Sequence, residues 1–353
     1  MKRLCSAFLA IVLGSSALTF AQPNSAVPAT GAQSAPAISH RIDLDVVVTD
    51  KSGKPVTGLT QQDFTLLDDK QPGPILAFHE VDRSVQKTDP PLQVIVLIDT
   101  VNLPMPRIAF IRQEFQKFLR QNAGHLAQPV TVFWFTGQGV KMSRKLYTDG
   151  NALAAELDSP ESQTLAIRRM GREYNDVEHL ALSIAALTAI AQSEAKVPGK
   201  KLLIWPGHGW PMLDNRRVQL PTAVQRQDFQ KIVELSTRLR EARISLYSAS
   251  FDELSPNVQL YREFLSGVKS PDKMALPNLN LRVLAVQSGG RVVGPDNHLA
   301  DQIADCVRDA DAFYSLSFDP PRAANPDEYH DLKIEVDKPG LQARTNTGYY
   351  NQP

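Results

Sequence analysis

The segment that most limits the fold of this chain is residues 94–103, VIVLIDTVNL, an apolar run that ends in an acid. Five of its first six residues are β-branched or leucine, and the sixth is Asp99. A run of this kind is typical of a strand that is buried on both faces of a parallel sheet. Because ligands bind at the carboxyl ends of such strands, Asp99 is predicted to lie at the ligand edge of the sheet.

Strands and helices alternate through residues 90–311, which predicts a doubly wound, mostly parallel α/β sheet. Further strands are predicted at 129–137, 200–207, 243–250 and 291–293, with an edge-type strand within 140–150. Apolar residues at helical spacing predict helices at 107–122, 176–195, 223–242, 279–290 and 299–310. Residues 251–278 contain three prolines and no clear period, and we expect them to be irregular.

Both ends of this α/β region have the pattern of antiparallel β structure. Residues 40–84 begin with the alternating segment RIDLDVVVTD and continue with short strands around an Asp-Asp-Lys turn. In residues 312–350, Leu332, Ile334 and Val336 alternate in the same way. We therefore predict one small antiparallel β-sandwich, built from both ends of the chain, with the α/β domain inserted. Two separate β appendages are the alternative.

The N-terminal residues have the pattern of an export signal followed by a tether. Two basic residues precede an apolar run at 4–13, and small residues follow up to Ala21, which predicts a cleaved signal peptide at 1–21. An uncleaved anchor is the alternative, but the run ends well short of the roughly 20 apolar residues of a membrane span. Residues 22–39 predict a disordered linker. We expect an exported protein, periplasmic or extracellular, without a transmembrane span in the mature chain.

Charge and cysteine content limit the classes of partner and linkage. The chain has 38 Lys plus Arg and 38 Asp plus Glu and no long basic run, so electrostatics does not favour nucleic acid or an anionic membrane as a partner. Cys5 leaves with the predicted signal peptide, and Cys306 alone cannot form an intramolecular disulfide. Cys306 is predicted to be a small buried residue on the apolar side of its helix. The oligomeric state is left open.

Several segments together resemble a von Willebrand factor type A domain: VIVLID, the series of crossover helices, SGGRVV and YSLSFDPP. The flanking segments VVVTDKSGKPVTGLTQQDFTLLDD and LKIEVDKPGLQARTNTGYY, with KLLIWPGHGWP inside the domain, are similar to VWFA-related proteins of acidobacteria. The resemblance covers about residues 40–350. It implies a Rossmann-like, type A-like α/β domain that is flanked by, or inserted in, the β module.

The resemblance also implies a metal-ion-dependent adhesion site, but this chain keeps only part of it. In the family, an Asp-x-Ser-x-Ser loop, a Thr and a second Asp supply oxygen ligands, which suit Mg²⁺. Asp99 matches the first ligand, whereas Val101 and Leu103 replace the serines. Asn175 or Asp176 could offer a substitute oxygen. We expect a degenerate site with no bound metal and Asp99 as its vestige, and an ion site with substitute ligands is the alternative.

The polar residues at the predicted strand ends are therefore candidates for a binding face. The candidates are Asp99, Thr100, Asn102, Gly207, His208 and Trp210. In the loop WPGHGWP, Trp205 is expected in the core and Trp210 on the surface, where tryptophan is common at binding hot spots. The structural alternative is that Asp99 accepts hydrogen bonds from loop N–H groups and that the loop tryptophans pack onto the domain.

No catalytic motif is present: neither a Gly-x-Ser-x-Gly elbow, nor a phosphate-binding loop, nor a His-Glu-x-x-His helix occurs. We expect no catalytic residues and no cofactor. The hypothesis is an exported interaction or adhesion module that binds an unknown protein or cell-surface ligand. One alternative is a hydrolase that uses Asp99 and His208, and another is that the β module carries the binding while the α/β domain is a spacer.

Overall fold

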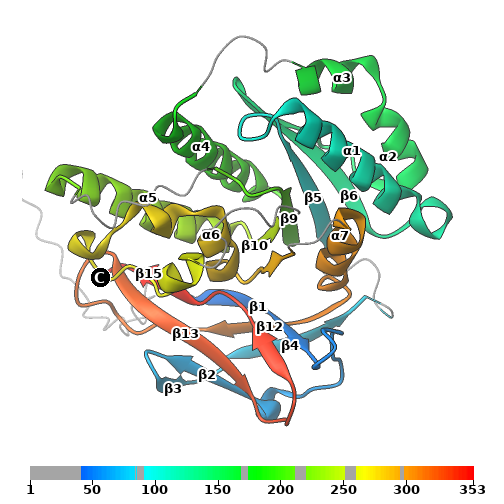
Figure 1. Ribbon diagram of the computed structural model, residues 1–353. Helices are drawn as coiled ribbons and strands as arrows, with labels where there is room; N and C mark the ends of the chain where they lie inside the picture. Colours follow the sequence, from blue (N-terminus) through cyan, green and yellow to red (C-terminus); the bar gives the residue numbers. More distant parts are fainter. Residues whose placement is uncertain are drawn as a thin grey trace, which may run out of the picture. The chain divides into compact units, whose positions relative to one another are not determined.

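A computed structural model describes residues 41–83, 85, 91–167, 174–210, 220–250, 260–294 and 298–353. The predicted signal peptide and linker, and Pro256 in the irregular region, lie outside the described residues. Within them the chain is a mixed α/β structure with one mostly parallel sheet and two antiparallel sheets, as the sequence predicts (Figure 1). No helix in these ranges is long and apolar enough to cross a membrane.

The main sheet has seven strands in the order β11-β10-β9-β5-β6-β7, with β8 also paired to β6. Its parallel part comprises β11 (Val292–Val293), β10 (Ile244–Ala249), β9 (Lys200–Pro206), β5 (Leu92–Asp99) and β6 (His125–Thr136). The antiparallel edge is formed by β7 (Gly139–Met142) and β8 (Tyr147–Asp149). The edge strand expected within 140–150 is therefore two short strands.

Strand β5 is buried on both faces because its apolar side chains point alternately into two cores. Val94, Val96 and Ile98 join the core that includes residues of α1 (Met105–Arg120) and α7 (Leu299–Arg308). Ile95 and Leu97 join the core with α4 (Asp176–Glu194), α5 (Thr222–Glu241) and α6 (Leu281–Gln287). Helices therefore cover both faces of the sheet, and β5 is the central strand whose end positions Asp99.

Two short helices between β8 and α4 are absent from the sequence-based expectation. They are α2 (Gly150–Leu157) and α3 (Pro160–Ile167). Helix α2 begins where the Asp149 side chain accepts hydrogen bonds from the backbone N–H groups of Asn151 and Ala152. This cap falls in a segment that the sequence assigns to an edge strand, and β8 does occupy the three residues before the helix.

The two antiparallel sheets combine strands from both ends of the chain. One has the order β14-β1-β12-β4, with β14 (Gln342–Arg344), β1 (Ile42–Thr49), β12 (Ala312–Phe318) and β4 (Ala77–Asp82). The other has the order β15-β13-β2-β3, with β15 (Gly348–Asn351), β13 (Glu328–Val336), β2 (Phe64–Asp68) and β3 (Gln71–Gly73). Leu44, Leu66, Tyr314 and Ile334 belong to one buried cluster, so the sheets pack as a sandwich.

Partly buried ion pairs of Arg243 with Asp45 and of Arg344 with Asp309 join the sandwich to the α/β part. Arg243, which precedes β10, pairs with Asp45 of β1, and Arg291 and Arg344 both pair with the buried Asp309. Close to them lies Lys200, which is 1% exposed. Its Nζ stands 4.4 Å from the centre of the Phe313 ring and has no hydrogen-bond partner among the described residues. Burial lowers the pKa of Lys200.

Cys306 is a buried free cysteine in the apolar core beside α7, as the sequence predicts. Burial raises the pKa of its thiol to about 12. A thiol that stays protonated at neutral pH is a poor nucleophile, so Cys306 contributes packing and no chemistry.

Candidate functional site

The side chain of Asp99 lies at the end of β5 and is fully buried. We call it the floor of the candidate site. Oδ1 accepts hydrogen bonds from the backbone N–H groups of Val101 and Asn102, at 2.8 and 2.9 Å. Oδ2 accepts from Nδ2 of Asn102 at 2.7 Å and from Nε1 of Trp205 at 3.1 Å. A carboxylate has about four acceptor positions, so every one of them is occupied. Asp99 thus fixes the loop after β5, which is the structural role that the sequence leaves as the alternative.

These contacts leave no room for an ion at Asp99. A cation could bind a carboxylate oxygen only if it displaced one of the four N–H donors, each of which would then be buried without a partner. Val101 and Leu103, at the positions of the family's serines, are each 1% exposed and belong to the two cores. The residues present therefore do not fit the adhesion-site metal that the resemblance implies. Burial raises the pKa of Asp99, although the four hydrogen bonds oppose that shift.

Asn102 connects Asp99 to a histidine on α4. Its Nδ2 donates to Asp99 and also to Oγ of Ser183 at 3.0 Å, so its Oδ1 is free to accept. The Nδ1 atom of His179 lies 2.9 Å from that Oδ1. Because an amide oxygen only accepts, His179 must carry a proton on Nδ1. In its neutral form His179 then presents a lone pair on Nε2, and its side chain is partly exposed.

Thr100 holds the neighbouring strand end. Its backbone N–H and its Oγ1 both donate to the carbonyl oxygen of Phe135, at 2.9 and 2.8 Å. Phe135 lies in β6, so Thr100 ties the loop after β5 to the adjacent parallel strand. Its hydroxyl is committed to this bond, and its residue is only 2% exposed.

The loop that begins at Trp205 is packed against the domain. Trp205 is in the core, as expected, and its ring meets the edge of Trp210 at a centroid distance of 5.5 Å. Trp210 is 2% exposed, so the prediction that Trp210 lies on the surface is wrong. Gly209 has a φ of 72°, and a Cβ there would stand 2.8 Å from Leu281, which explains how the glycine lets the loop approach α6.

Among the described residues of that loop, 205–210, His208 is partly exposed and lies between the buried Gly207 and Gly209. Within the described residues no hydrogen bond or ion pair joins His208 to Asp99, whose acceptor positions are all used. The pair that the hydrolase alternative requires is therefore not formed. Asp214, the next acid along the chain, lies outside the described residues.

The exposed residues near this edge include two, Met105 and Val177, that the sequence does not single out. Met105, at the start of α1, is 40% exposed, and Val177, in the first turn of α4, is 65% exposed. Gly137 and Gln138, after β6, are also exposed. Val177 shares helical spacing with the buried Ile184 and Ala191, so its pattern alone predicts burial. Except for the partly exposed His208, the predicted residues are buried, and we call Met105, Gln138, Val177 and His179 the rim.

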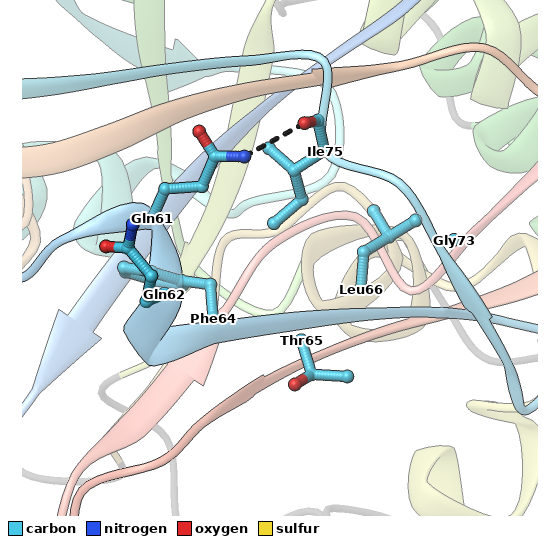
Figure 2. A pocket seen from close by; sticks show the side chains of 7 residues that line it. All are labelled: Gln61, Gln62, Phe64, Thr65, Leu66, Gly73 and Ile75. Atoms are coloured by element: carbon cyan, nitrogen blue, oxygen red, sulfur yellow. Dashed lines mark hydrogen bonds between the residues drawn. The ribbon is translucent and has the colours of Figure 1, made fainter.

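A separate hollow of about 410 Å³ lies in the sandwich beside β2 (Figure 2). Its walls are Gln61, Gln62, Phe64, Thr65, Leu66, Gly73 and Ile75. Nε2 of Gln61 donates to the carbonyl oxygen of Ile75 at 3.0 Å across one side. None of the seven lining residues is charged, so the hollow offers no acid, base or metal ligand.

No protein-family model matches the sequence. No curated protein matches it either. Among solved structures, the chain is similar to proximal thread matrix protein 1 from the mussel byssus, with 13% identity, a TM-score of 0.35 and coverage of 62% of this chain and 48% of that one. Human COPII-coat protein Sec24c gives 8% identity, a TM-score of 0.34 and coverage of 78% and 46%. The chain spans about half the length of these two proteins.

Two further solved structures have TM-scores in the same range. Manganese-loaded TRAP protein from Plasmodium vivax gives 8% identity, a TM-score of 0.34 and coverage of 76% of this chain and 96% of that one. The pilus adhesin SpaC from Lactobacillus rhamnosus GG gives 8% identity, a TM-score of 0.35 and coverage of 86% and 49%. TM-scores of this size carry no functional argument, so the function has to be argued from the site itself.

Proposed function

We propose that this protein is an exported, non-catalytic interaction or adhesion module that binds a protein or cell-surface ligand through the rim. The observation that carries the proposal is the saturated Asp99 carboxylate at the end of β5, with exposed apolar residues at the starts of α1 and α4. The hydrogen bonds make the floor rigid, and rigid loops at the carboxyl ends of parallel strands are a common place for recognition. Met105 and Val177 are exposed and offer apolar contact area to a partner.

We assign the α/β part to the type A-like fold, with a degenerate site that works without an ion. Support comes from the central strand β5, which ends in Asp99 and is followed by a helix, and from helices on both faces of the sheet. The substitute-ligand alternative is weakened because Oδ1 of Asn175 accepts the backbone N–H of Glu178 at 3.0 Å and caps α4. The hydrolase alternative is weakened because the hydroxyl of Thr100 is committed to Phe135.

The test first identifies the partner by crosslinking from a rim residue and then substitutes the residues that we propose contact it. A photo-crosslinking amino acid at position 177 should attach a partner on living cells or in culture medium, and unlabelled protein should compete with it. Val177→Glu and Met105→Glu should each weaken binding of that partner by roughly tenfold, because truncation or charging of a central contact typically costs more than 1 kcal/mol.

Leu146→Glu is the matched control, since Leu146 is an equally exposed apolar residue at 49% outside the rim. It should leave binding unchanged, and EDTA should leave binding by the unmodified protein unchanged as well. Equal binding by all three variants would show that the rim is not the contact surface. Loss of binding in EDTA, restored by Mg²⁺, would instead establish an ion-dependent module.

A further inference from the structure

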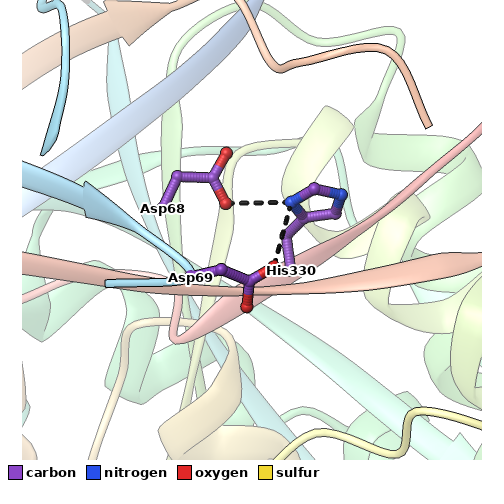
Figure 3. Close-up of side chains that lie close together, drawn as sticks. All are labelled: Asp68, Asp69 and His330. Atoms are coloured by element: carbon purple, nitrogen blue, oxygen red, sulfur yellow. Dashed lines mark hydrogen bonds and ion pairs between the residues drawn. The ribbon is translucent and has the colours of Figure 1, made fainter. Parts of the chain in front are cut away.

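Three side chains with metal-ligating atoms meet in the sandwich, at elements that take no part in the rim. Asp68 ends β2, Asp69 follows it in the turn to β3, and His330 lies in β13 (Figure 3). One ligand atom of each residue lies within 4.8 Å of the other two. The paired register of β2 and β13 holds them together, because Leu332 lies opposite Asp68.

The distances match those between ligands of one ion. Nδ1 of His330 stands 2.9 Å from Oδ1 of Asp68 and 3.4 Å from Oδ2 of Asp69. Ligand atoms that share a Zn²⁺ ion at about 2.0–2.2 Å stand roughly 3–3.5 Å apart. A single proton on Nδ1 can form a hydrogen bond with the nearer carboxylate, that of Asp68. An ion in its place would contact Nδ1 and one oxygen of each carboxylate.

The second oxygen of each carboxylate is held by a group outside the cluster. The hydroxyl of Tyr349 donates to Oδ2 of Asp68 at 2.7 Å, and the backbone N–H of Asp331 donates to Oδ1 of Asp69 at 3.1 Å. Each carboxylate therefore turns its other oxygen toward His330. The imidazole stacks on the ring of Tyr349, with centroids 4.9 Å apart and an interplanar angle of 15°. Outer hydrogen bonds of this kind orient the ligands of known metal sites.

The cluster also lacks a cation of its own. In the described part of the chain neither Asp68 nor Asp69 forms an ion pair with lysine or arginine, so two carboxylates converge on one imidazole. The His330 side chain is 9% exposed, and its Nε2 has no hydrogen-bond partner among the described residues. Its polar contacts are all made through Nδ1, on the side where the carboxylates lie.

We propose that Asp68, Asp69 and His330 bind one divalent transition-metal ion, with Zn²⁺ as the best fit. An imidazole nitrogen with two carboxylate oxygens suits Zn²⁺ or Mn²⁺, whereas Mg²⁺ and Ca²⁺ prefer oxygen ligands alone. The Asp69 side chain is 46% exposed and provides the path of entry. In a neutral imidazole the ion takes the place of the Nδ1 proton, which moves to Nε2, and it ties the turn between β2 and β3 to β13.

The experiment is isothermal titration of the EDTA-treated, dialysed protein with ZnCl₂ near neutral pH. One Zn²⁺ ion per chain should bind. MgCl₂ should give no heat beyond dilution. Absence of Zn²⁺ binding, or equal binding of Mg²⁺, would overturn the proposal.

Two ligand variants and their matched controls locate the ion. Asp69→Asn and His330→Gln should abolish binding, whereas Asp337→Asn and His79→Gln, which change exposed residues of the sandwich, should retain it. Tyr349→Phe should weaken binding roughly tenfold to a hundredfold, because it releases Asp68. Circular dichroism confirms that each variant folds, and Asp69→Asn keeps the test decisive if His330→Gln does not. Zn²⁺ binding that survives both ligand variants would place the ion elsewhere.

Discussion

Replacement of Asp99 by asparagine distinguishes two roles for this residue. Asp99 either fixes the loop after β5 through hydrogen bonds or is a ligand of an empty metal site. An amide oxygen can accept two of the four N–H donors that point at Asp99, and the amide nitrogen would face the other two. Each buried donor left without an acceptor costs about 1–3 kcal/mol, which gives roughly 2–6 kcal/mol for the pair. Removal of a buried charge offsets part of this cost. We expect the free energy of unfolding to fall by about 2–4 kcal/mol.

The assay is urea or thermal unfolding in EDTA, with Asp337→Asn as the control for loss of an exposed acid. For a chain of this size each kcal/mol corresponds to about 2 °C in the midpoint, so the expected decrease is roughly 4–8 °C. A ligand of an empty ion site behaves in the opposite way, because neutralising an unpaired buried carboxylate stabilises the fold. Unchanged or increased stability of Asp99→Asn in EDTA would refute the reasoning about the saturated carboxylate.

Three further results follow from individual contacts. Nitrogen-correlated NMR should show that the neutral form of His179 carries its proton on Nδ1, and Asn102→Ala should shift that proton toward Nε2. A dominant Nε2-protonated form in the unmodified protein would contradict the hydrogen bond between His179 and Asn102. Lys200→Met should stabilise the fold by roughly 1–3 kcal/mol near neutral pH, because it removes a buried amino group that has no hydrogen-bond partner among the described residues. Since the pKa of Lys200 is lowered in the folded state, the free energy of unfolding of the unmodified protein should rise with pH up to the ordinary lysine pKa. The stability gained by Lys200→Met should therefore shrink in unfolding measurements at higher pH. A gain that does not change with pH would argue against the lowered pKa. Gly209→Ala should lower stability by about 1–3 kcal/mol in the same unfolding assay, whereas Gly53→Ala, at a positive φ with open space around it, should cost less.

The sequence predicts the α/β sheet well because local patterns carry the necessary information. The alternation of Val94, Ile95 and Val96 between two cores follows directly from a strand buried on both faces. Trp210 shows where this reasoning fails, since a tryptophan between a glycine and a proline has no period that reports burial. Its burial depends on tertiary packing, including the contact of its ring with Trp205.

The candidate sites depend on contacts that no linear motif encodes. Asp99 could be placed at the strand end, but its four donors come from the following loop and from Trp205, more than 100 positions later in the chain. His179 contacts Asn102 from the first turns of a helix that the sequence assigned only to packing. His330 meets Asp68 across a separation of 262 residues, which only the pairing of β2 with β13 brings about.

The pairing of strands from opposite ends of the chain also determines the order in which the protein can fold. Leu44 of β1 pairs with Leu316 of β12, and Leu66 of β2 pairs with Ile334 of β13. At a synthesis rate of about 5–20 residues per second, the first strands wait tens of seconds for their partners. The α/β part is complete before the sandwich can close, so β1 remains without β12 and β14, and β2 remains without β13, throughout that interval. Closure of these long loops is then the slow step, and a chain that stops before β12 leaves each sheet of the sandwich without one central strand and one edge strand.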